Sequence, residues 1–240
     1  MRLRNYITTL FVAFAAVAAA AQTQVVAHRG YWREPGSAQN SIASLCKADS
    51  IDCYGSELDV WLSTDGVLFV NHDVEQSSSA ELSAIILDNG EHMPTLDEYL
   101  AKAKTLKTRI VLELKAHQTK EKEAEAVAKI VEMVEKYGLT DRTEYISFSL
   151  FACKEFKRVA PQGTDIYYLN GELSPAELKT LGFAGFDYSM GPIKKHPEWI
   201  EEAHKLGLKV NVWTIDKEAD MQWLINQKVD FITTNEPVLL

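Results

Sequence analysis

A regular alternation of short β-rich runs with amphipathic helical patterns constrains this chain more than any other feature. Runs rich in β-branched and aromatic residues predict eight strands, at 25–27, 56–60, 109–114, 144–148, 165–169, 185–188, 209–213 and 231–233. Helical periodicity lies between them, as at 121–137, which ends at Gly138, and after Ser174, where Pro175 begins a helix that ends near Gly182. The alternation predicts an α/β fold of the (β/α)8 TIM barrel type, with a doubly wound open sheet as the alternative.

The domain organisation follows from chain length and from the character of the first residues. A barrel of this type takes about 200 to 250 residues, so residues 22–240 are expected to form a single domain. Residues 1–21 begin with Arg2 and Arg4, continue with an apolar run and end in Ala19 and Ala21, which is typical of a cleaved signal peptide. We therefore expect an exported protein, periplasmic or extracellular. A membrane anchor is the alternative, disfavoured because the run is shorter than the roughly 20 residues that span a bilayer.

Charge and cysteine content limit the partners. Loss of Arg2 and Arg4 from the 25 basic residues, with all 34 acidic ones kept, moves the net charge from −9 to −11. An acidic surface disfavours nucleic acid and anionic membranes as partners, so an anionic small-molecule substrate would need a local cationic site. Three cysteines do not make a disulfide framework, although an exported protein could bridge Cys46 and Cys53.

A ninth β-rich run, 67–71, follows the second strand after only a Ser63-Thr64-Asp65-Gly66 turn. This connection is too short for a parallel crossover, which takes about a dozen residues, so the run is expected to return antiparallel. Folding the chain about the Thr64–Asp65 midpoint places His72 opposite roughly residue 57. The sequence thus predicts a short hairpin that brings His72 beside Glu57.

Charged residues gather at the carboxyl ends of the first strands, the end at which barrels bind ligands. Glu57 and Asp59 share one face of the second strand, since side chains alternate along a strand, and Glu113 ends the third parallel strand. Three converging carboxylates repel one another unless a cation lies among them. Oxygen ligands favour Mg2+ or Ca2+ over zinc. The alternative for Glu113 and Lys115 is a structural ion pair.

The motifs, taken in order, resemble those of the glycerophosphodiester phosphodiesterases. The chain carries Ala27-His28-Arg29-Gly30, Glu57-Leu58-Asp59-Val60, Thr64-Asp65-Gly66, His72-Asp73, Pro94-Thr95-Leu96, Glu113-Leu114-Lys115, Val212-Trp213-Thr214 and Phe231-Ile232-Thr233-Thr234. Each tripeptide is weak evidence alone, whereas the ordered set, spanning about residues 25–237, is specific.

The resemblance implies hydrolysis of glycerophosphodiesters to glycerol 3-phosphate and an alcohol. It implies that His28 and His72 are the general acid and base. It implies that one divalent cation is bound by Glu57, Asp59 and Glu113. It further implies that phosphate or substrate is contacted by Arg29, Lys115, Asn40 and Trp213. It also implies attack by the substrate's own 2-hydroxyl, giving a cyclic phosphate that water opens. Imidazole titrates near neutrality, which suits proton transfer in both directions.

One departure from the family pattern stands close to these motifs. Where relatives carry Pro-Glu-Asn-Thr, this chain has Ala38-Gln39-Asn40-Ser41, so a neutral amide replaces an acid. Two alternative functions remain open at this point: phospholipase-type action on intact lipids, and phosphodiester binding without catalysis. The sequence does not decide the head group, Mg2+ versus Ca2+, the initial base or the oligomeric state.

Several residues have simpler interpretations. Trp213 is as consistent with packing as with a pocket wall, and packing is favoured for Phe148, Tyr188 and Trp32. The remaining histidines match no motif and are interpreted as surface residues: His92, His117, His196 and His204. The charged residues of 120–125 are interpreted as a solvated helix face.

Overall fold

The computed structural model describes residues 22–74 and 76–240, and its centre is a closed ring of eight parallel strands. The strands are β1 (Gln24–Ala27), β2 (Gly55–Leu62), β3 (Leu68–Val70), β4 (Arg109–Leu114), β5 (Thr143–Ser147), β6 (Ile166–Tyr168), β7 (Gly185–Ser189), β8 (Lys209–Trp213) and β9 (Phe231–Thr234). Pairing of β1 with both β2 and β9 closes the ring, and β3 pairs only with β2, antiparallel. The predicted TIM barrel with its hairpin return is confirmed. The predicted signal segment lies outside the described residues.

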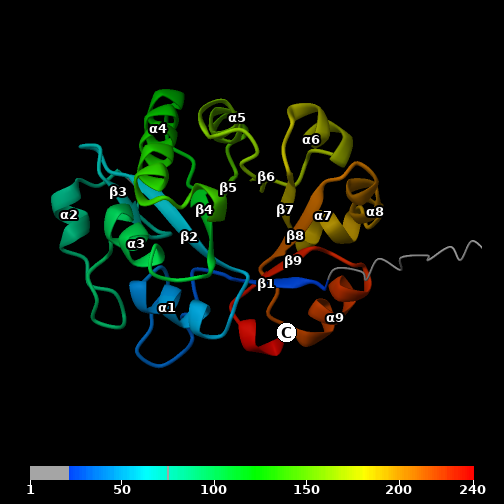
Figure 1. Cartoon of the computed structure of the whole chain (residues 1–240), viewed down its shortest axis with the longest axis horizontal. Helices are drawn as coiled ribbons and strands as arrows, with labels where there is room; N and C mark the ends of the chain where they lie inside the picture. Colours follow the sequence, from blue (N-terminus) through cyan, green and yellow to red (C-terminus); the bar gives the residue numbers. More distant parts are fainter. Residues whose placement is uncertain (1–21, 75) are drawn as a thin grey trace, which may run out of the picture.

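Helices surround the ring (Figure 1), and α9 lies near β1 and the C-terminus. Their bounds are α1 (Ile42–Ser50), α2 (Ser79–Ser83), α3 (Leu96–Ala103), α4 (Lys120–Tyr137), α5 (Leu150–Val159), α6 (Pro175–Leu181), α7 (Met190–Lys195), α8 (Glu198–Lys205) and α9 (Glu218–Asn226). Both predicted helices are present. Gly138 ends α4 with a φ of 68°, the left-handed conformation that glycine adopts without a steric penalty. No described helix combines the length and apolar character needed to cross a bilayer.

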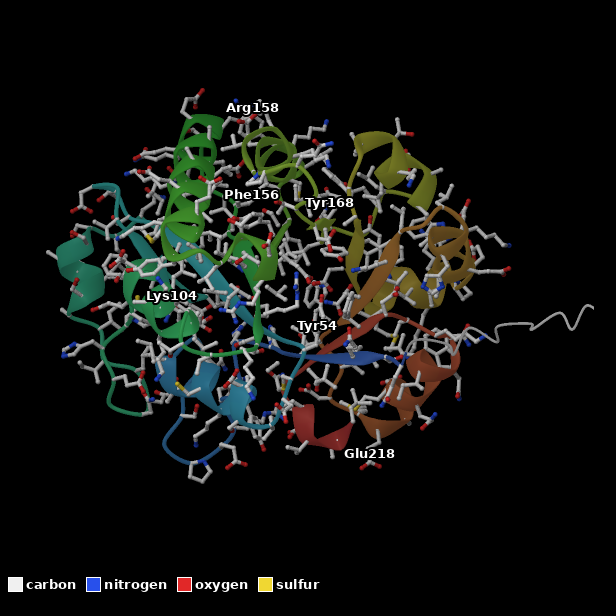
Figure 2. The ribbon with its side chains drawn as sticks, in the orientation of Figure 1. Tyr54, Lys104, Phe156, Arg158, Tyr168 and Glu218 are labelled. Carbon is white, nitrogen blue, oxygen red and sulfur yellow. The ribbon has the colours of Figure 1, made fainter. Side chains whose placement is uncertain are left out.

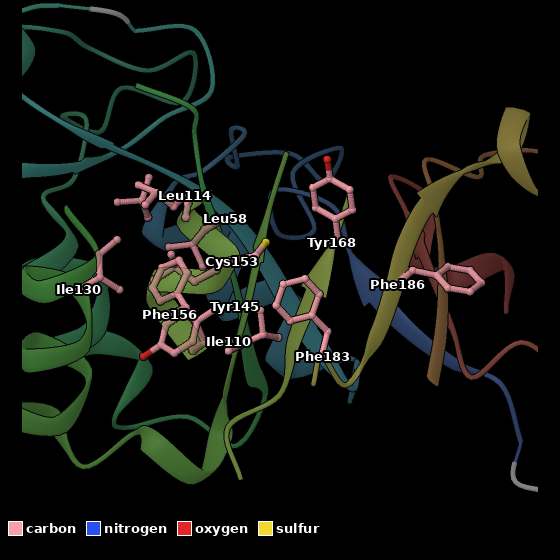
Figure 3. Packing of buried hydrophobic residues seen from close by; sticks show 14 of the residues in the cluster. Leu58, Ile110, Leu114, Ile130, Tyr145, Cys153, Phe156, Tyr168, Phe183 and Phe186 are labelled. Atoms are coloured by element: carbon pink, nitrogen blue, oxygen red, sulfur yellow. The ribbon is translucent and has the colours of Figure 1, made fainter. Parts of the chain in front are cut away.

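Strand alternation separates two cores. Outward residues such as Leu58, Val60 and Phe186 pack against the helices, as Figure 3 shows for Ile110, Tyr145 and Phe156 on the side of β4, β5 and α5. The rings of Tyr145 and Phe156 stack with centroids 4.2 Å apart. This layer buries the apolar stripe of each helix and holds the ring in place.

The inward positions form the second core, which is apolar in its middle. Val26, Val111, Ile146, Tyr167, Leu169 and Phe231 belong to this cluster. At the amino-terminal end Tyr54 packs on Phe231, with centroids 4.6 Å apart, and its hydroxyl bonds Glu144. In Figure 2 Tyr54 lies near the middle of the molecule, whereas Arg158 and Glu218 are peripheral. The lumen is thus closed at this end, and its charged residues gather at the other.

The hairpin register differs by one residue from the expected one. Val60 pairs with Val70 and Leu62 with Leu68, so the turn is centred on Asp65 rather than between Thr64 and Asp65. The register continued beyond β3 places residue 58, not 57, opposite His72. A bond from the Ser63 N–H to the Val67 carbonyl (2.8 Å) and the positive φ of Gly66 fix this turn, and spacing alone did not reveal them.

The three cysteines, Cys46, Cys53 and Cys153, are free thiols. The bridge considered between Cys46 and Cys53 is therefore not formed. Burial raises the pKa of the Cys53 thiol to about 12. This thiol behaves as a small apolar side chain at the edge of the barrel.

Candidate active site at the barrel mouth

A tight turn after β1 places His28 at the mouth. Arg29 and Gly30 have φ values of 56° and 75°, and a Cβ at Gly30 would lie 2.3 Å from the Ser44 hydroxyl oxygen. Glycine is therefore required at position 30. The turn aims the Arg29 N–H at Glu57, whose Oε2 accepts it at 2.7 Å. The His-Arg-Gly motif thus shapes the turn after β1 and orients Glu57, in addition to supplying the side chains of His28 and Arg29.

His28 is held by two residues from the end of the barrel. Its Nδ1 lies 2.8 Å from the Asn235 Oδ1, and the Asn235 amide nitrogen donates to the Asp216 Oδ2 at 2.8 Å. Because Asp216 accepts from the amide NH2, the carbonyl oxygen of Asn235 faces the imidazole, and Nδ1 carries the proton. Burial lowers the pKa of His28 to about 4, with Arg29 adding to the effect and Asn235 opposing it. His28 is therefore neutral at pH 7, with a free lone pair on Nε2.

Glu57, Asp59 and Glu113 converge as expected. Asp59 and Glu113 are register partners on β2 and β4, and one oxygen from each of the three residues lies within 4.8 Å of the others. All three are buried, at 7% exposure or less. Glu113 Oε1 has the Lys115 ammonium 2.9 Å away, but no well-oriented hydrogen bond from the described residues. Three buried carboxylates whose oxygens converge in this way fit a hard divalent cation.

The pKa values report this crowding. Burial, then Asp59 and Glu113, raise the pKa of Glu57 well above its usual value. Burial and Asp59 likewise raise the pKa of Glu113 to about 7, against the opposing effect of Lys115. Burial alone would raise the pKa of Asp59, but Lys115, the Asn40 hydrogen bond and Arg29 outweigh it, and the pKa is lowered. A bound cation would relieve the repulsion that raises two of these values.

Two positively charged side chains, Lys115 and Arg29, contact the carboxylates. Lys115 Nζ lies 2.9 Å from Glu113 Oε1 and 3.4 Å from Asp59 Oδ1, and Arg29 Nε lies 3.3 Å from Asp59 Oδ2. Burial opposes the charge of Lys115, but Glu113 and Asp59 raise its pKa overall. The ion pair between Glu113 and Lys115 is therefore present, and both cations also line the cavity at the mouth. That placement leaves them available to an anion.

The hairpin brings His72 to the same cavity as His28. Its Nδ1 contacts Asp73 Oδ1 at 2.5 Å, and its carbonyl accepts from the Trp61 indole N–H at 3.2 Å. The Asn71 N–H donates to the Asp59 carbonyl, which ties the chain beyond β3 to the carboxylate strand. The predicted pairing of two histidines around the carboxylates thus has its geometric basis.

Asn40 and Gln39 lie behind the carboxylates rather than on the cavity wall. Asn40 donates to Asp59 Oδ2 (2.9 Å) and accepts from the Asp59 N–H (3.1 Å), so its amide is already used. The structure therefore places it as a support for Asp59, unlike the substrate contact implied by the family resemblance. Gln39 Oε1 accepts from Arg29 Nη1 at 2.6 Å. The amide that replaces the family's acid thus faces Arg29.

The other side of the cavity is mainly apolar. Ile146, Phe148, Leu169 and Trp213 line it, together with Thr233 and Asp187, and its volume is about 90 Å3. Trp213 stands edge-on to Phe148 at 5.5 Å, and its indole N–H donates to the Asp187 carbonyl at 3.0 Å. Trp213 is therefore both packed and part of the wall. Phe148, for which packing was favoured, is also part of that wall.

Two interpretations of charged residues were wrong. His117 is half-buried, not a surface residue: its Nε2 accepts from the Leu62 N–H (3.0 Å) and its Nδ1 donates to the Lys115 carbonyl (2.7 Å). Glu123 is 5% exposed and accepts from the His117 N–H and the Ser149 hydroxyl. Helical periodicity could not reveal that the first turn of α4 folds under the loop after β4.

Sequence reasoning also missed Asn235, Asp216 and Asp187. Asn235 follows β9 and Asp216 follows β8, so both lie at the ligand end of the barrel. Asp187 was visible as an acid inside an apolar run. The position of each polar residue at or near a strand's carboxyl end was a usable signal.

Comparison with known proteins gives a consistent result. The sequence profile described as "Glycerophosphoryl diester phosphodiesterase family" matches residues 28–239. A crystal structure of a glycerophosphodiester phosphodiesterase from Parabacteroides distasonis is 48% identical, with a TM-score of 0.89 over 92% of this chain and 95% of that one. A curated glycerophosphodiester phosphodiesterase from Caldanaerobacter subterraneus is 28% identical over 91% of this chain and 96% of its own length.

One further solved structure carries a ligand. A phosphodiesterase from Oleispira antarctica, 27% identical with a TM-score of 0.75 over 90% of this chain and 94% of that one, was solved in complex with the product sn-glycerol-3-phosphate. The likeness in all these comparisons extends over nearly the whole barrel.

Proposed function

The chain belongs to the glycerophosphoryl diester phosphodiesterase family and hydrolyses glycerophosphodiesters, and on that premise we propose how its barrel mouth does so. The proposed reaction yields glycerol 3-phosphate and an alcohol and depends on one divalent cation, Mg2+ or Ca2+. The glycerol 3-phosphate seen in the Oleispira structure supports this product. One observation carries the proposal: three buried carboxylates lie in the same site as two histidines and two positively charged side chains, those of Arg29 and Lys115.

Glu57, Asp59 and Glu113 would hold the cation, each with one carboxylate oxygen. A cation held by these residues would supply positive charge to offset the charge of the phosphoryl oxygens and to favour loss of a proton from a nearby hydroxyl. Asn40 and the Arg29 N–H hold Asp59 and Glu57 in place through the hydrogen bonds described above. Supporting bonds of this kind orient ligands and raise affinity for a cation.

His28 is proposed as the initial base. Its Nδ1 proton is engaged by Asn235, and its pKa of about 4 leaves Nε2 unprotonated near neutrality. Nε2 would take the proton of the glycerol 2-hydroxyl as that oxygen forms its bond to phosphorus. His72, steadied at Nδ1 by Asp73, would give a proton to the oxygen of the departing alcohol. Water then opens the cyclic phosphate with the two roles exchanged.

Arg29 and Lys115 would bind the phosphoryl oxygens that point away from both histidines. Both line the cavity and both already contact carboxylates, so their positions are fixed before substrate arrives. Fixed donors stabilise developing charge at little cost in reorganisation. We also propose, from Arg2, Arg4 and the apolar run that follows them, that the enzyme acts outside the cytoplasm.

Turnover of glycerophosphocholine tests the proposal. Released glycerol 3-phosphate is measured for the wild type, His28→Ala and Glu57→Gln, with His92→Ala as a matched control because His92 is exposed and does not line the cavity. We expect the first two variants to be about 100-fold slower or worse, and the control to match the wild type. Equal rates in all four proteins would refute the assignment.

A further inference from the structure

Asp187 is a buried acid that the proposed chemistry does not use. It lies in the middle of β7, its side chain faces the lumen, and it is 2% exposed. Its Oδ1 has no hydrogen-bond partner among the described residues. An unsatisfied buried acceptor costs about 1 to 3 kcal/mol, so native proteins rarely keep one without a function.

Polar neighbours surround Asp187, and the Asn211 amide, opposite it on β8, donates to the carboxyl group and opposes the rise in its pKa. Asn211 and Thr233 bond each other, at 2.9 Å and 3.2 Å, and the Trp213 N–H donates to the main-chain carbonyl of Asp187 rather than to its carboxyl. Leu169 contributes only carbon to the cavity. Oδ1 itself has no donor among the described residues, and Asp187 lines the same cavity as Thr233 and Trp213.

Asp187 lies outside the group of acids proposed to hold the cation. Among the described residues, the one group of acids able to share an ion comprises Glu57, Asp59 and Glu113, without Asp187. Burial, then Glu113 and Glu144, raise the pKa of Asp187 well above its usual value. An acceptor lone pair is present on the carboxyl in either protonation state. Oδ1 can therefore accept a hydrogen bond from a hydroxyl or N–H group of a bound ligand.

A glycerophosphodiester brings two free hydroxyls into the mouth. The 2-hydroxyl is the proposed nucleophile and belongs with His28. The terminal hydroxyl needs its own acceptor, and Asp187 is the acid that lines the cavity on its apolar side. The carbon chain of glycerol can lie against Leu169 and Trp213, because these side chains offer no competing polar atoms there.

We propose that Asp187 is a specificity-determining residue that accepts a hydrogen bond from the terminal hydroxyl of the substrate's glycerol group. The inference rests on the proposed function and assigns one contact through which the site recognises the free glycerol end of a glycerophosphodiester. A lipid still acylated at this hydroxyl has no donor to offer and would leave Asp187 buried and unsatisfied. Sites built to bond a substrate hydroxyl discriminate strongly against analogues that lack it.

The test compares two substrates. Glycerophosphocholine has both hydroxyls, and propane-1,2-diol 1-phosphocholine keeps the nucleophilic 2-hydroxyl but lacks the terminal one. We expect the wild type to favour the first by about tenfold or more in kcat/KM. Asp187→Ala should bring this ratio within about threefold of one, by losing activity on glycerophosphocholine while cleaving the analogue at nearly the wild-type rate.

Controls separate specificity from structure. Asp165→Ala, at the opposite end of the barrel, should keep the wild-type ratio, and Asp187→Leu, which is similar in shape but has no acceptor, carries the test if the alanine variant does not fold. An unchanged ratio in the Asp187 variants, or an equal loss on both substrates, would overturn the inference while leaving the proposed function intact. No cleavage of glycerophosphocholine by the wild type would overturn both.

Discussion

The two sides of the barrel mouth differ although the same alternation builds them. The charged wall comes from the end of β1, the β2–β3 hairpin and β4 and consists of His28, Arg29, Glu57, His72, Glu113 and Lys115, with Asp59 in contact with two of them. The apolar wall comes from β5, β6 and β8 and their ends and consists of Ile146, Phe148, Leu169 and Trp213. The inward side chains at the mouth are mainly charged on one half of the ring and mainly apolar on the other, where Asp187 and Thr233 are the polar members. The difference indicates that the charged wall serves the chemical step and the apolar wall serves substrate binding.

Each wall depends on the other. An apolar wall excludes water and lowers the local dielectric constant, which strengthens the interactions of Arg29 and Lys115 with an anion opposite. The charged wall is stable because its members are paired, as in the contacts of Asp59 with Asn40, Arg29 and Lys115. Changes on the charged wall should therefore affect kcat, and changes on the apolar wall should affect KM.

The largest expected effect comes from the charged wall. Glu113→Gln removes a negative charge from the proposed cation site while keeping its shape, and we expect kcat to fall by about 100-fold or more at saturating cation. Thermal unfolding gives an independent measurement, because a ligand that binds only the folded state raises the Tm. Added Mg2+ or Ca2+ should raise the Tm of the wild type and leave that of the variant unchanged. A similar rise in both proteins would contradict the site.

The apolar wall should give a smaller effect of a different kind. Trp213→Leu removes ring surface and the N–H bond to the Asp187 carbonyl, and we expect KM to rise about tenfold with kcat within about threefold. Steady-state kinetics with glycerophosphocholine measures both values. A large loss in kcat at unchanged KM would break the comparison between the walls.

The pH dependence of stability sharpens the same contrast. His28 has a folded pKa of about 4 against an ordinary value of 6.5, so between these pH values the unfolded chain binds more protons and the folded state loses stability as pH falls. Urea unfolding of the cation-free protein should show a steeper loss between about pH 6.5 and 4 for the wild type than for His28→Asn. Identical slopes would mean that the fold does not hold His28 neutral.

The smallest effect concerns Gln39. Gln39→Glu would add a carboxylate beside the Arg29 guanidinium and draw the guanidinium away from the substrate phosphate. We expect KM to rise about twofold to threefold, which in binding free energy is less than a typical hydrogen bond contributes. The isosteric pair makes charge the only change. A tenfold or greater fall in kcat would show instead that position 39 takes part in chemistry.

Sequence analysis predicted the charged wall better than the apolar wall, for a physical reason. Glu57-x-Asp59 and Glu113-x-Lys115 are local patterns on single strands, where side-chain alternation fixes the shared face. A four-residue turn likewise indicated the hairpin, although its register required the hydrogen bonds of the Ser63–Val67 turn.

The remaining features depend on contacts between distant residues. His28 and Asn235 are 207 positions apart, and nothing local to His28 indicates its partner. The burial of Glu123 depends on how the loop after β4 folds over α4. Whether Oδ1 of Asp187 has a hydrogen-bond partner depends on the bonds that Asn211 and Thr233 form on the neighbouring strands. These facts belong to the closed ring rather than to any one segment.

One titration tests the central claim most directly. Protein freed of cations with a chelator receives Mg2+ in one series and Ca2+ in another, in steps, while bound ion and release of glycerol 3-phosphate from glycerophosphocholine are measured on the same samples. The account predicts negligible release without the ion and activity that rises in proportion to occupancy, reaching its maximum at one ion per chain. Full activity in the cation-free protein, or activity unrelated to occupancy, would contradict it.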